Sequence, residues 1–466
     1  MKRSTTTCPP SPSRIRLRRL LAHGSLLLLA AVFLAACSYD RDRGRATAAT
    51  DTEAAASSSP TADEAVASLA YDVLLENSGS MDGYVQGITS FEDDMYQLLV
   101  DLGYLADTLS LFYINSRPIP YTAGTEKFIN NLEPAEFQQR GGNRSNSDLN
   151  QIFGELLRRT SDRRVELLIS DFILSLGQGS TQDLLNNQRI GVYNTFRRRL
   201  ESAPFATYVV QMHSEFTGSY YTKDDQPVYL NGVRRPYYLC FTGPATAIRS
   251  LPTALRIEQL PGYAHSYTLL PEEASEMQTP FYTVLNNTYK QGSFRTDRAS
   301  AGQSPAGHRY VHGIENARPS QRSPSEGLFG FSVGVDMSGV AADASYLLDP
   351  DNYQVAAGYQ LDTVLALEDA QALHPRDQAM VADAASHVLV FSTTSNAYAD
   401  LQLTLKKQTP AWVQHTSTDD DTSIKNDEAA HDQTFGFRYL MAGMEEAYQN
   451  VYGRDPYFTL EVSVTR

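Results

Sequence analysis

Short apolar runs alternate with amphipathic stretches between residues 67 and 256, and this alternation constrains the fold more than any other feature. Runs typical of buried strands cover residues 71–75, 109–114, 165–169, 206–212 and 237–241. Apolar residues at helical spacing cover residues 91–105, 148–159, 181–200 and 244–255. The pattern predicts a doubly wound α/β fold, in which helices cover both faces of a parallel sheet. Ligands of such sheets bind beyond the carboxyl ends of the strands.

The rest of the folded chain has a different pattern. Residues 257–326 predict a connecting, irregular segment, because their second half is dense in Arg, Ser, Pro, Gly and Ala. Residues 327–466 hold several short runs with β-branched or aromatic residues, and one helix is expected at about 435–448. This alternation predicts a β-rich, sandwich-like domain at the C-terminal end.

The N-terminal segment has the features of a signal peptide. A positively charged stretch precedes an apolar run from Leu26 to Leu34, which ends in Leu34-Ala35-Ala36-Cys37. A plain N-terminal membrane helix is the alternative, although the run is short for one. The quartet resembles the lipobox of bacterial lipoproteins. The resemblance implies that residues 1–36 are removed, that Cys37 carries lipid chains as a membrane anchor, and that Ser38 favours outer-membrane sorting.

Residues 37–66 are expected to form the lipidated cysteine and a flexible tether. Between Ser38 and about Asp63 the chain consists mainly of Ala, Ser, Thr, Asp and Arg, with almost no large apolar side chains. Such a composition does not bury enough surface to order the backbone. The tether would place the folded part of the chain just clear of a lipid surface.

Polar residues follow two of the predicted strands in an order that points to a site. Glu76-Asn77-Ser78-Gly79-Ser80 comes after the first strand, and Asp171 comes after the third. Ser147 precedes the helix expected at 148–159 and is a candidate N-cap. This order resembles the von Willebrand factor A domain and its metal-ion-dependent adhesion site, over about residues 67–256. The resemblance implies that Glu76, Ser78, Ser80, Ser147 and Asp171 surround the ion.

What the resemblance implies about chemistry agrees with these residue types. Carboxylate and hydroxyl oxygens suit Mg²⁺, and Mn²⁺ accepts the same oxygen donors. An open position on the ion would take a protein partner. Ser145 is a second choice for the position given to Ser147. Glu76 departs from the family pattern, which has Asp there, so two interpretations stay open: a working ion site, or a loop that keeps the family shape and binds no metal.

Composition limits the other function classes. The formal charge is −15, with no dominant basic stripe, so nucleic acid is a poor partner. The sequence has no phosphate-binding Gly-Lys-Ser/Thr loop and no nucleophile elbow. The run Asp419-Asp420-Asp421 lacks the spacing of a calcium loop and is expected to be a solvated acidic loop.

Three functions remain. We expect a non-enzymatic, lipid-anchored protein of the bacterial cell envelope that binds another protein as an adhesion or scaffold module. The alternatives are a metal-dependent hydrolase that uses the same strand-end carboxylates, and a structural envelope component whose site is silent.

Overall fold

The computed structural model describes residues 69–466 apart from 141, 143, 145–146, 177–178, 273–278, 357, 371–372 and 396–397. The expected signal peptide, the lipidated Cys37, the whole of the tether and the second-choice residue Ser145 lie outside the described residues. No helix in the described part of the chain is both long enough and apolar enough to cross a membrane.

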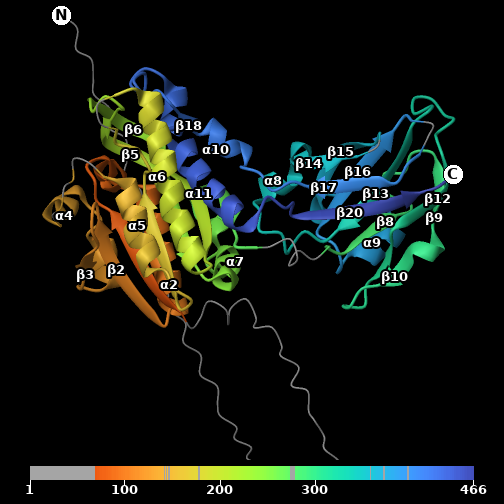
Figure 1. Ribbon diagram of the computed structural model, residues 1–466, viewed down its shortest axis with the longest axis horizontal. Helices are drawn as coiled ribbons and strands as arrows, with labels where there is room; N and C mark the ends of the chain where they lie inside the picture. Colours follow the sequence, from red (N-terminus) through yellow and green to blue (C-terminus); the bar gives the residue numbers. More distant parts are fainter. Residues whose placement is uncertain are drawn as a thin grey trace, which may run out of the picture. The chain divides into compact units, whose positions relative to one another are not determined.

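The first part of the fold is a seven-stranded sheet in the order β3-β2-β1-β4-β6-β5-β7 (Figure 1). At its centre, β1 is parallel to both β2 and β4. The strands are β1 (Ala70–Glu76), β2 (Thr108–Ile114), β3 (Ile119–Tyr121), β4 (Arg164–Ser170), β5 (Ala206–Tyr221), β6 (Pro227–Gly243) and β7 (Tyr263–Leu269). The remaining pairs in this sheet are antiparallel, so the expectation of a parallel sheet holds only at the centre.

The physical reason for this difference is the connection between β5 and β6. A turn over residues 222–226 joins them, and so short a connection can only link antiparallel neighbours. The two strands have 16 and 17 residues, whereas the three central strands have seven each. The hairpin β5–β6 therefore extends well beyond the carboxyl ends of the central strands.

Helices cover both faces of this sheet because successive strand residues point to opposite sides. In β1, Val73 and Leu75 belong to one apolar core, whereas Leu74 belongs to the other. The first core is covered by α2 (Ser90–Leu105) and α7 (Ala245–Ala254), and the second by α5 (Leu149–Arg159) and α6 (Thr181–Ser202). Shorter elements on this part are η1 (Ser80–Val85), α3 (Thr125–Asn130), α4 (Pro134–Gln139) and η2 (Ile257–Gln259).

The second part is β-rich and contains two larger sheets, one of five and one of four strands. Their orders are β14-β17-β20-β12-β9 and β15-β16-β13-β8. The strands are β8 (Tyr282–Leu285), β9 (Ser293–Thr296), β12 (Gly313–Arg318), β13 (Phe329–Val335), β14 (Tyr353–Val355), β15 (Gln360–Ala366), β16 (His387–Thr393), β17 (Leu401–Leu405) and β20 (Phe458–Val464). Apolar residues from both sheets form one shared core, which is the arrangement of a sandwich.

Smaller elements complete the β-rich part. They are η4 (Arg298–Ser300), β10 (Ala301–Gln303), β11 (Arg309–Val311), α8 (Ala344–Leu348), η5 (Pro350–Asn352), η6 (Leu367–Asp369) and α9 (Pro375–Val381). The segment 257–326, which we expected to be irregular, contributes β7 to the first sheet and β8, β9 and β12 to the sandwich. The strands of this segment are too short to show a repeated apolar pattern, which is why the sequence did not reveal them.

The chain leaves the sandwich between the paired strands β17 and β20, and we call residues 406–457 the excursion. The excursion holds α10 (Ala411–His415), β18 (Ser417–Thr418), η7 (Glu428–Asp432), β19 (Thr434–Phe435) and α11 (Phe437–Tyr452). The helix expected at 435–448 is α11, and its apolar side packs in the same core as α5 and α6 (Figure 1). α11 approaches α6 closely because Gly443 has no side chain: a Cβ there would lie 2.6 Å from the Arg189 carbonyl oxygen.

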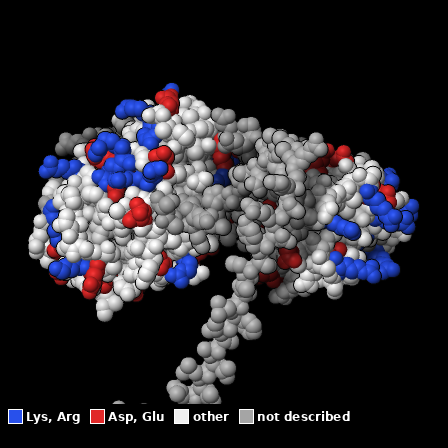
Figure 2. Space-filling view, turned by 90° about the horizontal axis from the view of Figure 1, so that it is seen from below, with Lys and Arg blue, Asp and Glu red and all other residues white. Residues whose placement is uncertain are grey.

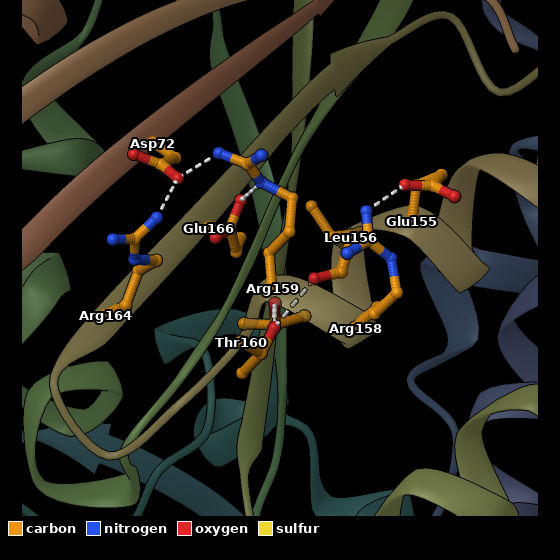
Figure 3. Close-up of polar contacts among 9 residues, drawn as sticks. Asp72, Glu155, Leu156, Arg158, Arg159, Thr160, Arg164 and Glu166 are labelled. Atoms are coloured by element: carbon orange, nitrogen blue, oxygen red, sulfur yellow. Dashed lines mark hydrogen bonds and ion pairs between the residues drawn. The ribbon is translucent and has the colours of Figure 1, made fainter. Parts of the chain in front are cut away.

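Charged residues inside the first sheet gather near the amino-terminal ends of β1 and β4 (Figure 3). Asp72 pairs with Arg159 and, at 2.6 Å, with Arg164. Arg159 Nε also lies 3.1 Å from the Glu166 carboxylate. Burial, followed by the nearby Asp72, raises the pKa of Glu166 to about 8. Asp72 and Glu166 each lie four residues before the carboxyl end of their strand. The cluster therefore serves as an internal comparison for residues at the carboxyl ends.

Candidate functional site

Glu76 and Asp171 are neighbours because β1 and β4 are adjacent parallel strands. Glu76 is the last residue of β1, and Asp171 directly follows Ser170, the last residue of β4. Both carboxyl groups are buried, with 2% of each residue exposed. The Ser170 hydroxyl donates a hydrogen bond to Glu76 Oε2. The fold therefore places two carboxylates at the carboxyl edge of the sheet, as the sequence predicted.

Ser78 and Ser80 lie in the loop that follows β1. Their hydroxyl oxygens are 3.1 Å apart. Between them, the Gly79 N–H donates to the Arg144 carbonyl oxygen at 3.0 Å. A Cβ on Gly79 would lie 3.3 Å from the Tyr221 ring, so this position has little room for a side chain. The turn thus presents both hydroxyls on the same side as Glu76.

Arg144 braces this loop from the outside. Its Nε donates to the Asn77 carbonyl oxygen at 2.8 Å, and an Nη donates to the Ser78 carbonyl oxygen at 3.2 Å. Its guanidinium also pairs with Asp82, in the first turn of η1. These contacts fix the backbone that carries Ser78, although the sequence analysis assigned no role to Arg144.

Ser147 is buried and faces the same place, but it does not cap the helix as we expected. The N-cap of α5 is Asp148, whose side chain accepts from the Gln151 N–H at 3.2 Å. A carboxylate is well suited to this role, because the positive end of the helix dipole also stabilises its negative charge. The Ser147 hydroxyl is thereby left to the site.

Four of the five predicted residues line one small pocket of about 30 Å³, and Asp171 is buried next to Glu76. The pocket is lined by Glu76, Ser78, Ser80 and Ser147, and on its outer side by Arg144 and Tyr221. We call Glu76, Ser78, Ser80, Ser147 and Asp171 the strand-end site. A pocket of this volume has room for an ion or for one or two waters.

The electrostatics of the strand-end site are unfavourable for two bare carboxylates. Burial, followed by the Asp171 charge, raises the pKa of Glu76, and the hydroxyls of Ser147, Ser170 and Ser78 oppose this rise. Burial also raises the pKa of Asp171, and the Ser80 hydroxyl, the Ile173 N–H and the Arg235 charge oppose it. A positive charge placed between the two carboxylates would relieve both effects.

Two buried oxygens in the strand-end site have no hydrogen-bond partner among the described residues. They are Asp171 Oδ2 and Ser147 Oγ. Ser147 Oγ lies close enough to Glu76 to favour its carboxylate form, yet it makes no hydrogen bond of ordinary geometry. Buried polar atoms almost always have a hydrogen-bond partner. These two oxygens are therefore suited to coordinate a cation.

The donor set fits a hard cation. Every candidate ligand is a carboxylate or hydroxyl oxygen, which suits Mg²⁺ or Mn²⁺. Within the described ranges, no group of three or more His, Cys, Asp or Glu side chains is placed to hold a metal. A cation at this edge would therefore rest on two carboxylates and on serine hydroxyls.

Sequence reasoning missed a buried arginine beside this site. Arg235 is fully buried and donates to the carbonyl oxygens of His431 and Gln433, each at 3.2 Å. Its guanidinium lies 4.4 Å from the centre of the Tyr220 ring. The hairpin strand that carries Arg235 has no local pattern that separates a buried arginine from an exposed one, because the partners come from the excursion.

The run Asp419-Asp420-Asp421 is only partly the solvated loop that we expected, because Asp420 is exposed whereas Asp421 is not. Asp421 is buried and accepts from the Tyr220 hydroxyl at 2.7 Å and from the Lys223 N–H at 2.9 Å. Asp420 pairs with Lys223, and Asp419 pairs with Arg438. Asp420 and Asp421 attach the excursion to the β5–β6 hairpin, which also lines the pocket, whereas the pair of Asp419 and Arg438 lies within the excursion.

The buried charges around the strand-end site do not balance. Glu76, Asp171 and Asp421 are three buried acids, and the Arg235 guanidinium is the fully buried cation near them. When all three acids are ionised, this set carries an excess of two negative charges. A divalent cation would neutralise it.

On the outer surface, charges of both signs lie close together. Figure 2 shows one face, on which Lys and Arg side chains neighbour Asp and Glu side chains. Neighbouring opposite charges weaken each other's field.

The structure brings together all five predicted strand-end residues, whereas Ser145 and Cys37 lie outside the described residues. Comparison of the chain with protein-family models, with curated proteins and with solved structures gave no match.

Proposed function

We propose that this chain is a lipid-anchored protein of the bacterial cell envelope, and that its α/β part binds a protein partner through a divalent cation at the strand-end site. The proposal includes the likeness to the von Willebrand factor A domain, with Glu76 in the place of the usual Asp. The observation that carries it is the pair of buried, unpartnered oxygens, Asp171 Oδ2 and Ser147 Oγ, beside a second buried carboxylate.

Charge and size support a divalent cation over other occupants. When Glu76, Asp171 and Asp421 are ionised, the excess of two negative charges matches one Mg²⁺ or Mn²⁺, and the pocket of about 30 Å³ has room for such an ion. Glu76, Ser78, Ser80, Ser147 and Asp171 would hold the ion. When bound, the ion would supply a Lewis-acid position open to an oxygen donor of the partner. Tyr221 lines the same pocket, so a partner that reaches the ion would pass beside it.

Calorimetric titration of Mg²⁺ and Mn²⁺ into the full chain tests the ion site. We expect binding by the parent, and its loss in the Glu76→Gln and Asp171→Asn variants. Glu166→Gln is the matched control, because it changes another buried glutamate of the same sheet away from the strand ends. Absence of heat in the parent, or equal loss in the control, would contradict the proposal.

Retention of envelope proteins on the immobilised chain tests the partner. We expect a protein that stays bound in Mg²⁺, elutes in chelator, and fails to bind Glu76→Gln while still binding Glu166→Gln. If the retained protein stayed bound in chelator and also bound Glu76→Gln, the interface would not depend on an ion.

The lipid anchor and its location need a separate experiment. Labelling of cells with a palmitate analogue should mark the parent and not a Cys37→Ser variant, and the label should follow the outer-membrane fraction. Label that persists in Cys37→Ser would contradict lipidation at this residue.

A further inference from the structure

The residue that follows Asp171 has an unusual backbone. Phe172 has φ 51°, in the left-handed region that residues with a Cβ rarely adopt. Its N–H donates at 2.9 Å to the Ser170 hydroxyl, which itself donates to Glu76. The strained residue therefore directly follows one carboxylate of the strand-end site and is linked to the other through the Ser170 hydroxyl. Such strain persists only where the surrounding structure holds it in place.

What holds Phe172 is a stack of aromatic rings. Its ring lies 5.2 Å from the Tyr238 ring, at an interplanar angle of 10°. Tyr238 in turn stacks on Phe437 at 4.3 Å, and Phe437 stacks on Trp412 at 5.7 Å. We call Phe172, Tyr238, Phe437 and Trp412 the aromatic column. Its first two members belong to the first sheet and its loop, and its last two belong to the excursion.

Hydrogen bonds join the same two parts of the chain. The Leu174 N–H donates to the Phe435 carbonyl oxygen at 3.4 Å, and the Tyr238 hydroxyl donates to Thr434 Oγ1 at 3.0 Å. Tyr238 is also the direct cross-strand neighbour of Ser170. The excursion therefore contacts the loop after β4, and Leu174 of that loop also lines the pocket.

We propose that Phe172 is a positioning residue for the strand-end site, and that the aromatic column makes ion binding at Asp171 and docking of the excursion support each other. Because the left-handed residue sets the direction of the chain just after Asp171, a loss of stacking lets that chain relax and moves the Asp171 oxygens. By linkage, an ion that holds Asp171 also holds Phe172 against Phe437. The coupling rests on the proposed function, whereas the positioning of the loop does not.

The sole tryptophan provides a direct readout of the coupling. Trp412 lies at the excursion end of the column and is 6% exposed. Addition of Mg²⁺ to the full chain should change Trp412 emission with the same midpoint as the calorimetric titration. It should also slow amide exchange at residues 434–437. Heat of binding with no change in either signal would overturn the coupling and leave the proposed function standing.

A substitution in the excursion tests the positioning role. Phe437→Leu should weaken Mg²⁺ binding at least tenfold and remove the Trp412 response. The matched control is Phe196→Leu, because Phe196 is a buried phenylalanine of the same core that lies outside the column. The control should change the Mg²⁺ affinity less than twofold. Equal weakening in both variants would overturn the proposal, because it would indicate general loss of packing.

Amide exchange without any ion separates this inference from the proposed function. In Phe437→Leu, the amides of residues 172–174 should exchange at least tenfold faster than in Phe196→Leu. Equal exchange in the two variants would overturn the positioning role. If the parent binds no divalent cation, the proposed function and the coupling both fail, and the exchange data alone decide whether Phe437 positions the loop. If Phe437→Leu does not fold, Phe437→Met replaces it in both measurements.

Discussion

Replacement of Glu76 by Gln should stabilise the fold at alkaline pH while it removes cation binding. Glu76 is 2% exposed, and burial followed by the Asp171 charge raises its pKa from 4.5 to about 7. A glutamine keeps the shape of the side chain and its carbonyl oxygen still accepts from Ser170. Because the amide carries no charge, the variant avoids the repulsion from Asp171.

The magnitude follows from the shift in pKa. A folded-state pKa above the unfolded value means that protonation favours the folded state. The stabilising effect of the proton is full below pH 4.5 and disappears as the pH rises through about 7. The shift corresponds to about 3 kcal/mol. The Gln variant should therefore match the parent near pH 4.5 and exceed it by up to about 3 kcal/mol near pH 8.5.

Urea unfolding followed by Trp412 fluorescence measures this difference, at pH 5 and pH 8.5, with and without Mg²⁺. At pH 8.5, an Mg²⁺ concentration of 100 times its Kd should stabilise the parent by about 2.7 kcal/mol and leave Glu76→Gln unchanged. Glu166→Gln should keep the Mg²⁺ effect. The reasoning would be refuted if the Gln variant were less stable than the parent at pH 8.5. It would also be refuted if the free energies of unfolding of variant and parent differed by the same amount at both pH values.

Three further predictions concern packing and bracing. Arg144→Gln removes the donors to the Asn77 and Ser78 carbonyls, so calorimetry should show roughly tenfold weaker Mg²⁺ binding. An unchanged Kd would mean that the loop keeps its conformation without Arg144. Gly443→Ala places a Cβ 2.6 Å from a backbone oxygen of α6 and should lower the stability by about 1–3 kcal/mol in urea. Gly154→Ala, which meets open space within α5, should not lower it. Asp377 accepts from the backbone N–H groups of 286–288, so Asp377→Asn should lower the free energy of unfolding of the sandwich by about 2–3 kcal/mol, and no change in its thermal unfolding would contradict this.

The sequence alone determined the centre of the fold and the place of the site. Apolar runs with a period of two or of 3.6 residues located β1, β2 and β4 and the helices α2, α5 and α6. The parallel direction of the central strands followed from the alternation, so Glu76 and Asp171 could be expected at one edge, whereas the strand order came only from the structure. These features depend on local periodicity, which a single sequence displays directly.

Tertiary structure decided which other residues share that edge. The antiparallel hairpin β5–β6, the buried Arg235 and the buried Asp421 depend on partners that are far away in sequence. The excursion reaches the loop after Asp171 from more than 240 residues further along the chain, through the stacking of Phe437. A charged or aromatic residue has the same local pattern whether it is exposed or buried. Its role is set by whether a distant segment supplies the opposite charge or the facing ring, and only the folded chain contains that information.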